Sequence, residues 1–167
     1  MATDHLNVVE RELIDNLRTG TYSGGTAWSS GDVTVFGQFP ETEDIKYPCI
    51  IVQMLANGIE EQFMGQAVSS GSSTVVGELY GIGFNMNIAV DKESSITVDG
   101  TPYKQRRLLN YLMINCANVL MDCDFTNTDT EVVQRLYTGF RNVGYEPMLE
   151  VWAAMTGMIL IFKNTRG

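Results

Sequence analysis

The chain has 167 residues, of which 44% are hydrophobic and 19% charged, a composition typical of one globular domain, here residues 1–167, rather than of a disordered segment. Eleven lysines and arginines stand against 20 aspartates and glutamates, so the formal net charge is -9. This balance excludes broad DNA binding, which needs clustered positive charge, but it suits a wall past which DNA slides without sticking.

The cysteines and the apolar runs restrict the class of protein further. Cys49, Cys116 and Cys123 form no CxxC pair, and their odd number favours neither a disulfide framework nor a zinc site. The polar start of the chain is unlike a signal peptide, and no apolar run approaches the roughly 20 residues that cross a membrane. A soluble protein made in a reducing cytoplasm, with no membrane partner, is expected.

The first predicted element is a helix that starts at residue 3 or 4 and ends before Gly20. Its apolar residues recur at three- and four-residue spacing, which places Leu6, Val9, Leu13 and Leu17 on one face. Residues 21–32 are rich in Gly and Ser and are predicted to form a loop. Trp28 is difficult to place in a core from such a loop, so we expect it to be an interface anchor.

Three strands are predicted in the next third of the chain. Residues 33–39 form the first, and an acidic, exposed connector precedes the second at residues 49–55, which is apolar on both faces as a central strand is. Residues 59–66 form the third. The small, polar stretch 67–77 follows; we expect it to be mobile and to become ordered on a neighbouring subunit or tube, with a plain flexible hairpin as the alternative. Its centre is a candidate interface made of Ser69, Ser70, Gly71, Ser72 and Ser73.

The clearest strand is residues 78–90, where apolar residues alternate with small and polar ones. Its apolar members are Ile82, Phe84, Met86, Ile88 and Val90. Residues 91–102 are predicted to turn at Asp99-Gly100, with Thr101 and Pro102 as the N-cap and first residue of a second helix.

That second helix should bury one face on the sheet. The residues on this face are Leu108, Leu109, Leu112, Cys116, Val119 and Leu120. Two further strands, at residues 131–145 and 148–164, complete the pattern. The fold class predicted is α+β, with a mostly antiparallel mixed sheet packed by two helices.

Residues with catalytic or ligand-binding chemistry do not form a convincing set. His5 stands in the first turn of a terminal helix, and Cys116 is better explained as a small buried hydrophobe, since it has no histidine partner. Gly81 and Gly83 are a lone GxG without the helix of a nucleotide site, and the acidic residues of 122–129 lack the glycine of a calcium loop. We therefore predict no enzyme, no cofactor and no metal.

Lys104, Arg106 and Arg107 carry the only local excess of positive charge. They stand near the N-terminus of the second helix, the end at which the helix dipole disfavours cations. Two interpretations stay open: contacts with a partner, for example the acidic residues 41–44 of a neighbour, or surface ion pairs with residues 41–44 or 91–93 of the same chain. Trp152 is in an apolar strand and is expected in the core rather than an interface.

The order of these elements resembles the tail terminator, or tail-completion, proteins of tailed bacteriophages. The resemblance begins with the N-terminal amphipathic helix and continues with YPCIIVQML at residues 47–55 and GELYGIGFNMNIAVD at residues 77–91. It then includes RRLLNYLMINCANVL at residues 106–120 and GYEPMLEVWAAMTGMILIF at residues 144–162, so that the segments together cover most of the chain.

This resemblance implies structural work in the virion. The family forms homohexameric rings that cap the head-proximal end of the tail tube, stop its growth and dock to the head or neck. Its partners would be further copies of the chain, the tail tube protein, a head-tail connector or neck protein and, in contractile tails, the sheath, while genomic DNA passes through the lumen without specific binding. Two alternatives remain: another connector, neck or tail-tube component, and, more distantly, a small-ligand binding module or enzyme.

Overall fold

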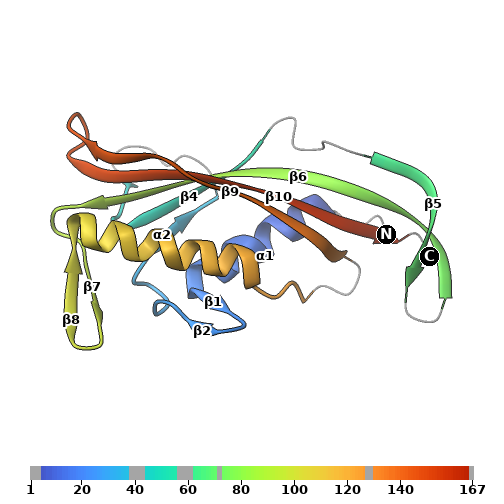
Figure 1. Ribbon diagram of the computed structural model, residues 1–167, viewed down its shortest axis with the longest axis horizontal. Helices are drawn as coiled ribbons and strands as arrows, with labels where there is room; N and C mark the ends of the chain where they lie inside the picture. The colour runs from blue at the N-terminus through green and yellow to red at the C-terminus, as the bar shows by residue number, and fades with distance from the viewer. Residues whose placement is uncertain (1–4, 38–43, 56–61, 71–72, 127–129, 166–167) are drawn as a thin grey trace.

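A computed structural model describes residues 5–37, 44–55, 62–70, 73–126 and 130–165. Within these residues, the helices α1 (His5–Thr19) and α2 (Gln105–Asp122) lie on one side of a six-stranded sheet (Figure 1). Two short hairpins lie on the same side: β1 (Thr21–Tyr22) with β2 (Gly25–Thr26), and β7 (Ser95–Val98) with β8 (Thr101–Lys104). The α+β class with a mostly antiparallel mixed sheet packed by two helices is confirmed.

The strands of the large sheet differ greatly in length. They are β3 (Thr34–Phe36), β4 (Cys49–Met54), β5 (Gln62–Ser70), β6 (Ser73–Asp91), β9 (Thr130–Glu146) and β10 (Val151–Thr165). Their order is β3-β4-β6-β10-β9, and β5 pairs with the start of β6, along the edge that β4 occupies further on. Within this sheet β3 and β4 run parallel and the other pairs are antiparallel, so the predicted central strand at 49–55 is confirmed in its place.

The core forms where the apolar face of β6 meets the two helices. The alternating residues of β6 identified above are each at most 1% exposed. All six residues predicted for the buried face of α2 are fully buried, and Val9, Leu13 and Leu17 of α1 complete the layer. The 3.6-residue and two-residue periods therefore identified both sides of the core correctly.

The predicted start of the second helix is wrong. Thr101 and Pro102 belong to β8, which pairs with β7, and α2 begins only at Gln105. Asp99 and Gly100 both have positive φ, 49° and 78°, as the two central residues of a tight type I′ hairpin turn do. The turn signal at Asp99-Gly100 was therefore correct, but it joins two strands rather than a strand and a helix.

Two predicted irregular stretches contain paired strands. The loop predicted at 21–32 includes the β1–β2 hairpin, and β5 and β6 extend into the stretch 67–77, where Ser70 pairs with Ser73. The stretch is part of a β-hairpin, which was the alternative interpretation, and Gly71 and Ser72 lie outside the described residues. The predicted strand at 33–39 is shorter in the described region and ends at Phe36.

Candidate functional site

Trp28, predicted as an exposed anchor, is buried in the core with only 3% of its surface exposed. The β1–β2 hairpin lies beside the end of α1 (Figure 1), and Trp28, which follows it, belongs to the core cluster that includes Leu13 and Leu17 of that helix. Its Nε1 donates a hydrogen bond to the carbonyl oxygen of Leu17 at 2.9 Å. A buried indole with its one donor satisfied is a packing element, so the interface role predicted for Trp28 is wrong.

The basic cluster of Lys104, Arg106 and Arg107 lies exposed at the start of α2. The Arg107 guanidinium carbon stands 4.2 Å from the centre of the Tyr103 ring, a cation–π contact. Among the described residues none of the three cations forms an ion pair, so pairing with residues 91–93 of the same chain does not occur. Residues 41–43 lie outside the described part of the chain.

The serine cluster predicted as an interface lies at the other end of the molecule from the basic cluster. Ser69, Ser70 and Ser73 belong to the end of the β5–β6 hairpin, which projects past the helices, whereas the start of α2 lies beside the β7–β8 hairpin (Figure 1). The structure therefore does not bring the predicted interface residues into one site. It divides them between two opposite ends of the sheet.

The sheet face turned away from the helices carries an apolar area that the sequence reading missed. Strand register places Ile159 between Leu136 of β9 and Gly83 of β6, on the face opposite the buried Phe84. Leu55 covers Gly83, since a Cβ on that glycine would lie 2.9 Å from the Leu55 Cδ1 atom. Leu55 and Leu136 are 38% and 42% exposed. We call Leu55, Leu136, Ile159 and the half-buried Ile161 the outer patch.

A second exposed apolar feature is the turn between β9 and β10. Met148 is 90% exposed and Leu149 61% exposed, and the exposed Glu146 and Glu150 flank them. We call Met148 and Leu149 the apolar tip. The sequence does contain a signal for this feature, because turns normally carry polar residues, whereas a methionine and a leucine stand here between Glu146-Pro147 and Glu150.

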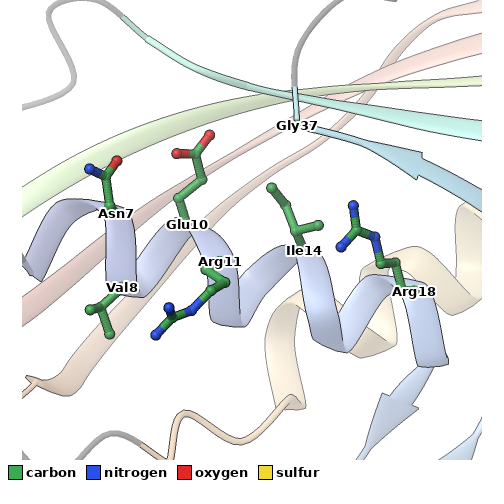
Figure 2. Close-up of a pocket in the computed structure, with 7 residues that line it drawn as sticks. All are labelled: Asn7, Val8, Glu10, Arg11, Ile14, Arg18 and Gly37. Atoms are coloured by element: carbon green, nitrogen blue, oxygen red, sulfur yellow. The ribbon is translucent and has the colours of Figure 1, made fainter.

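A groove runs along α1 beside the end of β3. Its volume is about 650 Å³, and its lining residues are Asn7, Val8, Glu10, Arg11, Ile14, Arg18 and Gly37. Figure 2 shows Glu10, Ile14 and Arg18 pointing from the helix toward the segment that ends at Gly37. We call this the α1 groove. It combines an apolar floor with two arginines and one glutamate.

No protein-family model and no curated protein matches this chain. Neither helix in the described part of the chain has the length and apolar character that crossing a bilayer requires.

The three cysteine side chains are buried in the interior of the fold. Cys49, Cys116 and Cys123 are each 0% exposed and free. Burial raises the pKa of Cys49 and of Cys116 to about 12 and that of Cys123 to about 11. A thiol in this state is protonated at neutral pH and is a poor nucleophile, as the sequence interpretation of Cys116 expected.

A smaller groove of about 450 Å³ lies between α1 and the segment after α2. Arg11, Glu12, Asp15 and Asp124 are among its lining residues, together with Asn16 and several threonines. In the region that the structure describes, no group of three or more His, Cys, Asp or Glu side chains is arranged to hold a metal ion. Across the smaller groove, the Asn16 side chain donates a hydrogen bond to the backbone carbonyl oxygen of Asp124 at 2.9 Å.

Proposed function

We propose that this chain is a structural virion protein, a tail terminator that assembles as a homohexameric ring. The ring would cap the head-proximal end of the tail tube, stop its growth and dock to the head or neck, with DNA passing through the lumen. The observation that carries the proposal is the apolar outer patch on a sheet face that no described helix covers (Figure 1).

The outer patch favours an assembly role because large exposed apolar side chains are costly in water. Each square ångström of apolar surface removed from water stabilises a complex by about 25 cal/mol. Leu55 and Leu136 come from segments far apart in the sequence, yet Leu55 lies against Gly83 and Leu136 pairs with Ile159, which in turn pairs with Gly83. Exposed apolar side chains that gather on one sheet face are characteristic of a protein–protein contact.

The open sheet edges favour a closed assembly as well. β9 forms one edge, and its pairing with β10 shifts register at three places, near Ala153, Thr156 and Ile161. Such bulges twist an edge strand and discourage indefinite strand addition. A ring in which each edge meets a neighbour would bury the remaining unpaired backbone groups without forming fibres.

Charge and resemblance are the remaining support. The net charge of -9 suits a lumen through which DNA moves without adhering. The segments that resemble tail terminators form β4, most of β6, most of α2, the β9–β10 turn and most of β10, which are adjacent in the folded chain. The basic cluster at the start of α2 makes no ion pair among the described residues and is available to an acidic neighbour.

The test is the mass of the purified protein by light scattering, alone and mixed with its tail tube protein, followed by negative-stain imaging. We expect a discrete ring, or a monomer that forms one ring at each tube end. Long self-stacked tubes would favour a tube component instead. A monomer that ignores tube ends would overturn the proposal, and a thermal-shift screen with nucleotides and metals would then test a ligand-binding role.

A further inference from the structure

We propose that the apolar tip of one chain docks into the α1 groove of a second copy, so that neighbouring chains associate head to tail. The inference rests on the proposed ring and deepens it, because it names the two surfaces that meet at each contact between subunits.

The tip has the form of a docking element. Met148 and Leu149 are strongly exposed for large apolar residues, at 90% and 61%. They are held at the end of a long hairpin, where Val151 pairs with Glu146 and closes the turn. Glu150 has a φ of 53°, a left-handed backbone conformation that residues other than glycine adopt only at some cost in energy. The turn thus presents two apolar side chains between two carboxylates.

The groove has the complementary chemistry. Ile14, 8% exposed, forms part of its floor, and the half-buried Val8 adds a second apolar surface. Arg11 and Arg18 are exposed at its rim, against one glutamate, Glu10. Its volume of about 650 Å³ lies in the range of sites that accept several side-chain groups.

The charges of the two surfaces are opposite in sign. The tip carries two glutamates, Glu146 and Glu150, and no cation, whereas the groove lining carries one more cation than anion. Arg18 is held only loosely inside its own chain, at 3.5 Å from Asp15 and 3.4 Å from the Val35 carbonyl oxygen. Its guanidinium can therefore reorient toward an incoming carboxylate without breaking a short hydrogen bond.

The tip and the groove are different parts of one chain, and this decides the kind of assembly. The β9–β10 turn lies at one end of the sheet, whereas α1 lies under its middle (Figure 1). A contact between two different surfaces leaves a free tip on one copy and a free groove on the other. Such head-to-tail contacts form a ring where the rotation between neighbours closes, as the proposed ring requires, whereas a two-fold contact would stop at a dimer.

The test uses two full-length variants, Met148→Ser/Leu149→Ser at the tip and Arg11→Glu/Arg18→Glu in the groove. Each is expected to weaken self-association, or ring formation at tube ends, at least tenfold, with an unchanged circular dichroism spectrum and thermal midpoint. When the two variants are mixed, the intact tip of the groove variant can still dock into the intact groove of the tip variant. Sedimentation should therefore show a complex of twice the 18.5 kDa monomer, which neither variant forms alone.

Glu146→Arg/Glu150→Arg added to the groove variant should restore assembly. Ile114→Ser, at an apolar residue 64% exposed on α2, is the matched control and should assemble like the wild type.

The outcomes separate this inference from the proposed function. Wild-type rings that persist in the tip variant would overturn the docking and leave the ring proposal standing. Loss of assembly in the groove variant alone would show that another segment or partner occupies the groove, and would also overturn it. Equal loss in the Ile114→Ser control would indicate general apolar aggregation rather than docking. A wild type that neither associates nor caps tubes would overturn both proposals.

Discussion

The indole of Trp28 is hydrogen-bonded to the carbonyl oxygen of Leu17 at 2.9 Å, in the last turn of α1. The final carbonyl groups of a helix have no partner within the helix, and this indole supplies one from another segment. Trp28→Phe should therefore reduce the free energy of unfolding by about 1 kcal/mol, with the larger loss of several kcal/mol in Trp28→Ala. Urea denaturation measures both. Trp152→Phe, at a half-buried residue whose ring contacts that of Tyr145 at a tilt of 58°, is the control and should cost less than Trp28→Phe.

Gly20 lies directly against the same indole. Its φ is 62°, and a Cβ added there would stand 2.9 Å from three atoms of the Trp28 ring. Gly20→Ala should therefore destabilise the fold by about 1–2 kcal/mol through the backbone alone, and further through the clash with the ring. In a Trp28→Ala background only the backbone part should remain. Equal losses in the two backgrounds, measured by urea denaturation, would contradict the contact.

Arg135 of β9 supplies a cation to the end of α2, a helix with no basic residue in its last turn. Its guanidinium donates to the carbonyl oxygen of Leu120 at 3.2 Å and to that of Cys123, and lies over the Phe125 ring. Arg135→Met should destabilise the fold by about 1.5–3 kcal/mol, because charge-assisted hydrogen bonds to the helix end are lost. Arg141→Met, at an exposed residue of the same strand, should change the unfolding free energy much less.

Because its thiols are buried, the protein should lose free energy of unfolding at alkaline pH. Folding raises the pKa of Cys116 from 9.0 to about 12 through burial, so the native state keeps a proton that the unfolded chain releases. The contribution of the protonated thiol to the free energy of unfolding is fully present below about pH 9. It is lost as the pH rises toward about 12, by up to ~1.4 kcal/mol per pH unit for each thiol. Urea denaturation at a series of pH values above 8 should show this slope, and Cys116→Ala should make it shallower. An unchanged slope would show that Cys116 does not contribute.

Substitution of Arg106 can distinguish a structural role of the basic cluster from a role in assembly. Its exposed side chain makes no hydrogen bond, ion pair or ring contact with the described residues, and it stands at the helix end where the dipole disfavours a cation. Arg106→Glu should therefore raise the unfolding free energy by about 0.3–1 kcal/mol while weakening ring formation at tube ends. The neighbouring Arg107→Glu also loses its contact with Tyr103 and should show no such gain. Stronger assembly in Arg106→Glu would rule out a contact with an acidic neighbour.

Local sequence patterns were sufficient to predict two of the buried faces. Alternation along residues 82–90 identified the buried face of β6, and the spacing from Leu108 to Leu120 identified the buried face of α2. Both predictions succeeded because side-chain direction repeats with the backbone geometry of the element itself. The α+β class followed from the order of these elements.

The positions of residues outside such patterns depend on how distant segments of the chain pack together. Trp28 belongs to a Gly- and Ser-rich stretch with no period, and it is buried because the β1–β2 hairpin folds back onto α1. The outer patch joins Leu55 to Leu136 across four strands, and neither residue has a local signal that distinguishes it. Contacts between segments far apart in the chain depend on strand order and register, which a local sequence pattern does not contain.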